Sequence, residues 1–411
     1  MNISTISLRA FVFLLFVCLV SISNIVTTVE SYNAVVYFRY VLSAFLVIFL
    51  FIVLSKQLST LVPAILVCIL FLYNLLLLNM QGMNLSFSDV INFLSISIGV
   101  MVITYAFGEK DGLAEVERKI IHGLYLYFGF SLILHLITGG ILIEIPPRFN
   151  FAYGSLLIGR EENYSLGLSN FYGMMSLVFL YSYHKKYNQG SLLILCSFFS
   201  MYLSMLGGAR GEFLITVLLW IALVIFYNLT IVKFIIIIPS IMFMVILLII
   251  NMERIGVSEH LSSIVFFQRM ESLISGDFSS RDTLIKSAVE LFYDNPICFI
   301  SGCGVGFFQY YNDFSHSLYP HNFLVEMLIS FGVFLTTSLL VVMCLGWVFF
   351  CKRNEGHVLS LLFVFSFLVS LKSGSMLTSW FAFSTILFFN YYYLFRITLK
   401  KLSNSRVSNV V

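Results

Sequence analysis

The sequence predicts an all-α, polytopic integral membrane protein with about twelve transmembrane helices and one large outward loop that contains short amphipathic helices. Three observations support this prediction. Hydrophobic residues make up 60% of the 411 positions and charged residues only 10%, whereas a soluble chain carries roughly a quarter charged residues. Apolar stretches of about 20 residues, long enough to cross the hydrocarbon core, recur along the chain. They are continuous rather than alternating, which favours helices over a membrane barrel.

The expected helices are the apolar runs between polar breaks. The first run follows Arg9 and resembles a signal peptide, but Ser21-Ile22-Ser23 is a weak cleavage site and further runs follow, so we expect an uncleaved helix. The 321–350 run exceeds one bilayer thickness, so its helix should tilt or project outward. The expected spans lie near residues 10–25, 34–54, 61–79, 89–107, 121–143, 164–183, 190–207, 212–228, 232–250, 321–350, 357–371 and 376–395.

The distribution of basic residues predicts the orientation of these spans. With both termini in the cytoplasm, 14 of the 23 basic residues face inward and 9 face outward, in line with the positive-inside tendency. Most of the inner group are lysines, whereas seven of the outer nine are arginines. Guanidinium groups suit phosphate and pyrophosphate, so the outward arginines point to the outer face as the functional one.

One connection is much longer than the others, and it divides the chain into three expected segments. Residues 1–250 hold spans one to nine, residues 251–320 form the outward loop, and residues 321–411 hold the last three spans and a cytoplasmic tail. A loop of this length is usually functional or disordered. Within it, Ser279-Ser280 can cap a helix that opens at Arg281, and Asn295-Pro296 should end that helix.

Apolar residues recur at helical spacing in this expected helix, and a weaker pattern lies between Leu261 and Ile274. Both segments would lie along the membrane surface or cap the helical bundle. Surface packing alone is the plainer interpretation of the stronger stripe, which consists of Leu284, Ile285, Ala288, Leu291 and Phe292.

Two arginines are the main candidates for binding an anion. Arg281 falls in the first turn of the capped helix, where the free N–H groups and the helix dipole already favour negative charge. A salt bridge with Asp282 or Glu290 is the structural alternative. Arg210 lies in a turn with three glycines, which permit close backbone approach to a bulky ligand. Its alternative is an interfacial arginine paired with Glu212.

The segment around Pro320 offers a candidate base. The ordinary pKa of histidine is near 6.5, so a neutral His321 can take a proton at physiological pH, although a solvated capping histidine is commoner. Asn322 and Glu326 are spaced to share a helix face and can orient a neighbour or a ligand. His316, five residues before His321, is a weaker candidate for the same role.

Weaker candidates complete the predicted outward surface. The glycines of Gly302-Cys303-Gly304-Val305-Gly306 do not match a dinucleotide fingerprint, but their spacing lets backbone N–H groups approach a phosphate or a sugar. Arg148 and Arg160 flank the Pro146-Pro147 break and can extend an anion-binding surface. His135 lies in the middle of a span, where a packing role is commoner than a proton relay.

Cysteines and acidic residues give no sign of a metal site. Among the seven cysteines, Cys298 and Cys303 are both expected on the outward side, where they can pair in an oxidising compartment or remain free thiols. No metal-ligand spacing of cysteine and histidine appears, and no acidic cluster suits Mg²⁺. We expect neither a metal nor another cofactor, and nothing in the composition points to nucleic acid.

The order of these features resembles that of the O-antigen polymerases and O-antigen ligases. An arginine in a Gly/Ala-rich turn comes first, within Leu206–Phe213. A long loop follows with an arginine at a helix start, a proline and a Gly-x-Gly-x-Gly-Phe stretch. His-Asn-Phe-Leu-Val-Glu then leads into a helix with Phe331-Gly332. The resemblance is specific over roughly residues 200–335, and elsewhere only the number of spans supports it.

The resemblance implies a glycosyltransferase of the bacterial inner membrane that takes glycan from undecaprenyl pyrophosphate at its periplasmic face. Arg210 and Arg281 would hold the pyrophosphate, and His321 would activate the acceptor hydroxyl, whereas His316 is displaced from the usual spacing. The reaction would be metal-independent and would invert the anomeric configuration. The implied partners are the lipid-linked oligosaccharide, membrane lipid and, in some systems, a chain-length regulator protein.

Three functions remain open at this point, and polymerase is the favoured one. A polymerase would pass glycan to another lipid-linked repeat unit, and a ligase would pass it to the lipopolysaccharide core. A transporter of lipid-linked sugar or a small solute is a third class. Transporters usually carry ionisable groups or broken helices near the membrane midplane, whereas most charges here lie at span ends or in outer loops.

Overall fold

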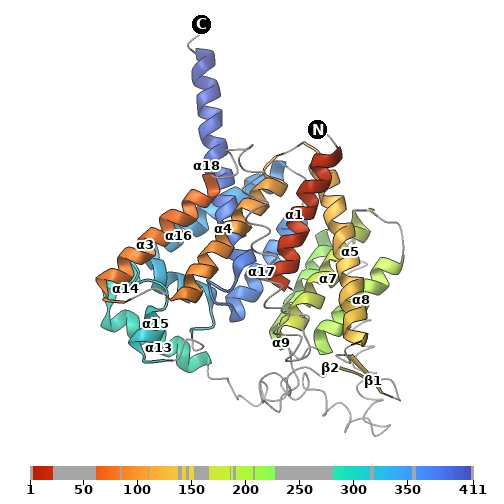
Figure 1. The fold of residues 1–411 in the computed structure, drawn as a ribbon, viewed down its shortest axis with the longest axis horizontal. Helices are drawn as coiled ribbons and strands as arrows, with labels where there is room; N and C mark the ends of the chain where they lie inside the picture. Colours follow the sequence, from red (N-terminus) through yellow and green to blue (C-terminus); the bar gives the residue numbers. More distant parts are fainter. Residues whose placement is uncertain are drawn as a thin grey trace. The chain divides into compact units, whose positions relative to one another are not determined.

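The computed structural model in Figure 1 is almost entirely helical over the part of the chain that it describes, in agreement with the predicted fold class. Expected spans at 34–54 and 232–250, and the weaker pattern at 261–274, lie outside the described residues. The structure describes residues 3–21, 62–83, 86–109, 111–137, 141–144, 148–151, 166–185, 187, 191–206, 209–226, 281–314, 319–353 and 358–408.

The chain divides into two compact units, and helices from both ends of the chain pack together in the first; the three expected segments stay a prediction. The first unit comprises Met1–Val20, Arg39–Ile120 and Ser279–Val411, and the second comprises Ser21–Phe38 and Ile121–Phe278. The helices of the first unit are α1 (Ile3–Ser21), α3 (Val62–Met80), α4 (Phe87–Phe107), α13 (Arg281–Asp294), α14 (Pro296–Ile300), α15 (Phe307–Tyr311), α16 (Phe323–Arg353), α17 (Val358–Ser373) and α18 (Trp380–Ser408).

The second unit is a smaller helical assembly with one pair of strands. Helix α5 (Leu113–Ile137) begins in the first unit and continues in the second. The expected helix over 121–143 therefore ends early, because Ile141–Glu144 forms strand β1, which pairs antiparallel with β2 (Arg148–Phe151). The other described elements of this unit are α7 (Leu166–His184), α8 (Ser191–Leu206) and α9 (Arg210–Phe226).

By length and composition, three of the described helices can cross a membrane, which agrees with the predicted membrane protein. They comprise Val62–Met80, Asp89–Phe107 and Phe323–Lys352. Shorter apolar helices cover Thr5–Ser21, Ser191–Met205, Gly211–Ile225 and Val358–Ser373. The total of about twelve spans stays a prediction.

Close helix contacts hold the core of the first unit together. Helices α16 and α18 approach so closely at Gly346 that a Cβ there would lie 2.1 Å from the carbonyl oxygen of Phe389. A similar approach of α4 and α18 places Gly99 against the side chain of Ser384. The buried Asn390 side chain donates to the carbonyl of Leu339 at 3.0 Å, which ties α18 to α16 with a polar contact. Small residues therefore permit the helices to approach closely, and hydrogen bonds from polar side chains stabilise that approach.

Two buried charged side chains satisfy helix ends in this unit. The guanidinium of Arg9 donates to the carbonyls of Tyr105, Ala106, Glu109 and Asp111 at 2.7–3.1 Å, so it caps the C-terminal end of α4. Cations are favoured there because the last carbonyls of a helix lack partners and carry the negative end of its dipole. The carboxylate of Glu117 accepts from the first amide of α17, that of Val358, at 3.1 Å.

Serine side chains join α7 to α8 in the second unit. The hydroxyls of Ser176 and Ser197 each donate to the other residue's carbonyl at 2.8 Å, and Trp220 of α9 donates to the Ser197 hydroxyl at 3.0 Å. One turn or more away, Ser204 donates to the carbonyl of Ser169 at 2.7 Å. Hydroxyls that bond across helices are the polar contacts expected between apolar helices in a membrane.

We expect Arg9→Met to lower the free energy of unfolding by about 3 kcal/mol, because it leaves several carbonyls at the end of α4 without their charged donor. Lys286→Met is the control, since the Lys286 side chain is 78% exposed and its surface ion pair with Glu290 has a distance of 4.0 Å. The control should cost less than about 1 kcal/mol. Thermal unfolding in detergent measures both, and equal losses would contradict the capping role.

Candidate functional site at the start of helix α16

The predicted His-Asn motif lies at the N-terminal end of α16, and its second residue is the helix cap. The side-chain oxygen of Asn322 accepts from the amides of Leu324 at 3.0 Å and Val325 at 3.2 Å. Asparagine is a preferred N-cap because it satisfies amides that have no partner within the helix. Asn322 therefore fixes the place where the helix begins and, with it, the position of the preceding histidine.

Glu326 orients a neighbouring turn, which is one of the two roles predicted for it. The side chain is buried, and its carboxylate accepts from the Met376 amide at 2.7 Å and from the Ser375 hydroxyl at 3.0 Å. These contacts tie the start of α16 to the turn between α17 and α18. A buried carboxylate needs such donors because desolvation of an unpaired charge is costly.

His321 has an unusual backbone conformation, with a φ of 52° in the left-handed region. Its ring lies 4.1 Å from the ring of Tyr319, and the Tyr319 hydroxyl donates to the carbonyl of Ser373 at the end of α17. Left-handed backbone is uncommon for residues other than glycine and occurs often at functional positions. The imidazole is half-buried and is positioned by the cap that follows it and by the tyrosine that precedes it.

Arg281 is the first residue of α13, as the sequence predicts, and the helix ends at Asp294 before Pro296. The predicted stripe is largely buried, since Leu284, Ala288 and Leu291 lie in a cluster that packs against α16. The cluster consists of Leu284, Ala288, Leu291, Cys298, Cys303, Phe307, Phe308 and Ile329. This packing agrees with the second of the two expected placements, in which the helix caps the helical bundle, and the placement along the membrane surface stays a prediction. The side chain of Arg281 is not among those that the structure describes.

The glycine-rich loop packs against a break in α16. Gly332 interrupts that helix with a φ of 73° and a ψ of 171°. A Cβ on Gly302 would lie 2.6 Å from the Ser330 carbonyl oxygen, and one on Gly332 would lie 2.3 Å from that of Ile300. Only glycine permits both the left-handed backbone and this approach.

The amides of Gly302, Cys303 and Gly304 bond within the chain, and the predicted contact of this loop with a phosphate or sugar stays a prediction. The Cys303 amide donates to the Ile329 carbonyl at 2.7 Å, and the Gly304 amide donates to that of Ser330 at 3.3 Å. The Gly302 amide donates to the Cys298 carbonyl at 3.1 Å. Gly306 also has a left-handed φ of 82° and precedes α15. Gly302 therefore permits close packing on α16, whereas a Cβ on Gly306 would meet nothing within 4 Å.

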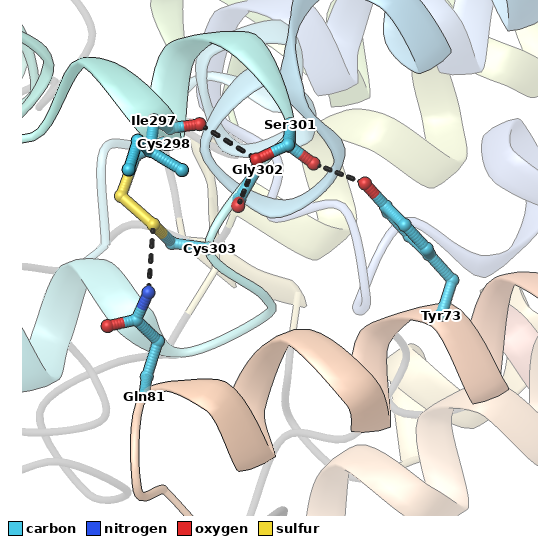
Figure 2. Close-up of a disulfide and its surroundings, with 7 residues drawn as sticks. All are labelled: Tyr73, Gln81, Ile297, Cys298, Ser301, Gly302 and Cys303. Carbon is cyan, nitrogen blue, oxygen red and sulfur yellow. Dashed lines mark hydrogen bonds between the residues drawn. A yellow bond between two sulfur atoms is a disulfide. The ribbon is translucent and has the colours of Figure 1, made fainter.

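Cys298 and Cys303 form a disulfide, which decides between the two alternatives left open by the sequence. Both cysteines are buried, and their Cα atoms lie 4.8 Å apart. Figure 2 shows that residues of α3 and the following turn flank this disulfide. Tyr73 donates to the Ser301 carbonyl at 2.5 Å, and Gln81 approaches the Cys303 sulfur at 3.7 Å.

The remaining candidates fall in the second unit or outside the described residues. Arg210 is the first residue of α9, and Arg148 is the first residue of β2, where it pairs in register with Glu144. Neither arginine side chain is described, nor is that of His135, and Arg160 and His316 lie outside the described residues. Because Arg210 belongs to one unit and His321 to the other, their convergence stays a prediction. Within the described ranges, no group of His, Cys, Asp and Glu residues can hold a metal ion.

Sequence reasoning missed three residues that shape this region. Tyr319 positions the His321 ring, Gly332 breaks α16, and Asn74 accepts from the Val305 amide at 2.6 Å. One signal was present for Gly332, since it lies in an apolar run too long for one straight span. Asn74 is a polar residue within an otherwise apolar run and can be recognised as a polar contact point between helices.

No protein-family model, curated protein or solved structure matches this chain.

The disulfide leads to a simple count of reactive thiols. Alkylation of the denatured, unreduced protein should modify the five free cysteines, and alkylation after reduction should modify all seven. Mass spectrometry of the intact chain measures this difference. Seven modified thiols without reductant would contradict the pairing.

Gly332→Ala should destabilise the protein more than an alanine at another left-handed glycine where the added Cβ meets no other atom. Gly82 supplies the control, because its φ is 69° but a Cβ there would meet nothing within 4 Å. Gly82→Ala should cost about 1–2 kcal/mol. In Gly332→Ala the new Cβ also clashes with the carbonyl of Ile300, so the backbone must shift. Its melting temperature in thermal unfolding should be clearly lower than that of Gly82→Ala. Equal melting temperatures would argue against the tight packing of the glycine loop on α16.

Proposed function

We propose that this protein is an O-antigen polymerase, a membrane glycosyltransferase that moves glycan from undecaprenyl pyrophosphate onto a lipid-linked repeat unit at the periplasmic face of the bacterial inner membrane. One observation carries the proposal beyond the resemblance of the sequence. Arg210 and Arg281 each open a helix, and the His321-Asn322 pair immediately precedes a third. Helix N-termini favour anions because their free amides and dipoles point outward.

The two arginines have the chemistry that a pyrophosphate leaving group requires. A guanidinium binds phosphate oxygens with two parallel hydrogen bonds and stays charged at any physiological pH. As the bond between the sugar and the pyrophosphate breaks, negative charge grows on the leaving oxygens. Fixed positive groups at that position lower the barrier because they do not need to reorganise during the reaction. Arg281 supplies one such group, and Arg210 keeps its predicted role as the second.

His321 is the proposed base for the acceptor sugar. Its imidazole would take the proton of the acceptor hydroxyl as the oxygen attacks the anomeric carbon and the bond to pyrophosphate breaks. A single displacement of this kind inverts the anomeric configuration. The Asn322 cap and the Tyr319 ring support this role because they fix the orientation that proton transfer needs.

The deletion of the gene, followed by electrophoresis of the surface glycolipid, tests the proposed function. Loss of a polymerase leaves a lipopolysaccharide core with a single repeat unit. Loss of a ligase leaves a core without any O-chain. An unchanged ladder of chain lengths rejects both enzymes and would favour the transporter or another function.

His321→Ala and Arg281→Ala should each abolish the chain-length ladder while the protein remains in the membrane. The loss in rate should be about 100-fold or more for each, the range typical for a positioned base or an oxyanion donor. Lys286→Ala is the matched control on α13, because Lys286 is exposed and pairs only with Glu290 in the described structure. Full complementation by the His321 or Arg281 variant would exclude the assigned chemistry.

A further inference from the structure

The segment from α14 to α15 has the composition of a membrane segment although it is not a spanning helix. No charged residue occurs between Asp294 and Asp313. The run contains the five-residue helix α14, the glycine loop and the five-residue helix α15. Such elements are too short to cross a bilayer, which takes about 20 helical residues. An uncharged run of this length is typical of a re-entrant or interfacial segment.

The segment contacts α3 well inside that helix rather than at its end. Tyr73 and Asn74 bond to the backbone of Ser301 and Val305. Tyr73 precedes the helix end at Met80 by seven residues, which corresponds to about 10 Å along the axis. Figure 2 shows the Tyr73 side chain reaching Ser301 from the middle of α3.

The outer surface of α3 is apolar up to its last turn, where Asn79 is also exposed, so the level of Tyr73 lies within the apolar zone. More than half of each side chain in this stripe is exposed, and the spacing places all of them on one helical face. The stripe consists of Ile65, Ile69, Leu72, Leu76 and Met80. Since α3 is also long and apolar enough to cross a membrane, this stripe is the surface that would meet lipid.

The irregular backbone of the glycine loop is satisfied by protein groups. Cys303 and Gly304 donate to carbonyls of α16, Val305 donates to Asn74, and the Ser301 carbonyl accepts from Tyr73. Nonhelical backbone at membrane depth is tolerated only where protein or water satisfies its polar groups. The loop meets this requirement through α3 and α16.

The outer face of α14 consists of exposed apolar side chains, of which Phe299 also contacts the ring of Phe292 at 5.4 Å. Ile297 is 69% exposed and Ile300 is 51% exposed, and Phe299 is exposed beside them. Exposed tyrosines lie at both ends of the segment, where Tyr311 donates to Asp294 at 2.5 Å. Tyrosines are enriched at membrane–water interfaces because the ring is apolar and the hydroxyl is polar.

We propose that α14 and the glycine loop form a re-entrant segment that enters one leaflet beside α3, with Ile297, Phe299 and Ile300 against lipid acyl chains. Acyl chains are the occupant because α14 packs against α16 and the loop that follows it bonds to α3, and both of these helices are long and apolar enough to cross a membrane. The disulfide closes the inserted loop, and the Asp294–Tyr311 pair marks its base at the interface. This inference does not depend on the proposed enzymatic activity.

Fluorescence quenching in reconstituted vesicles tests the insertion. The five free cysteines are replaced by alanine, Cys298 and Cys303 are kept, and a bimane-labelled cysteine is placed at Ile300→Cys or at the control Lys286→Cys. Retention of the buried disulfide on alkylation verifies the fold. Phospholipids brominated on the acyl chain should quench the label at 300 about threefold more than the label at 286, because the hydrocarbon core excludes exposed lysine positions. Aqueous iodide should show the reverse order.

Two results would overturn the proposal. Strong iodide quenching at position 300, equal to that at 286, would mean an aqueous loop. Protection of position 300 from both quenchers would mean that a second copy or another protein covers α14. If the cysteine-depleted chain loses its disulfide, Ile300→Trp and Lys286→Trp in the otherwise native chain give the same comparison. The readout is then the quenching by brominated lipid beyond that of the three native tryptophans.

Discussion

The left-handed break at Gly332 is the constraint on which the candidate site region depends. Without the break, the carbonyls of Ile329 and Ser330 would accept amides one turn further along α16. With it, they accept the amides of Cys303 and Gly304, and the Thr336 hydroxyl reaches back to the Met327 carbonyl at 3.0 Å. A helix interruption thus provides the acceptors that hold a loop from another part of the sequence.

A second set of contacts fixes the other side of the same region. Glu326 joins the start of α16 to the turn that follows α17, and Tyr319 joins His321 to the last residue of α17. The first connection uses the Met376 amide within that turn, and the second uses the Ser373 carbonyl at the end of α17, which would otherwise lack a partner. The position of the imidazole is therefore determined by its neighbours Tyr319 and Asn322, which are held at the end of α17 and the start of α16.

The helical elements could largely be predicted from the sequence, whereas the tertiary contacts could not. Continuous apolar runs indicate helices because only helices satisfy long apolar segments locally, and the serine and proline signals located α13. The disulfide stayed open because pairing depends on Cα separation, which a spacing of five residues does not determine. The early end of α5 at Ile137 was missed because a strand and a helix end look alike in an apolar run.

For the candidate site, the sequence identified the residue types but not the groups that each residue contacts. Asn322 and Glu326 were recognised as a pair on one helix face, yet their partners lie at the helix start itself and some 50 residues away in the chain. The glycine spacing was recognised as a close approach, but the sequence did not show that the group that approaches Gly302 is the backbone of α16. Long-range contacts of this kind leave no local pattern.

The buried guanidinium of Arg9 has a consequence for the order in which the protein is assembled. Its acceptors, from Tyr105 to Asp111, are synthesised about a hundred residues later than Arg9 itself. Nascent chains emerge from the ribosome N-terminus first. The Arg9 guanidinium therefore stays hydrated or bonds to other groups until the end of α4 has been synthesised. Only then can the carbonyls there accept its hydrogen bonds.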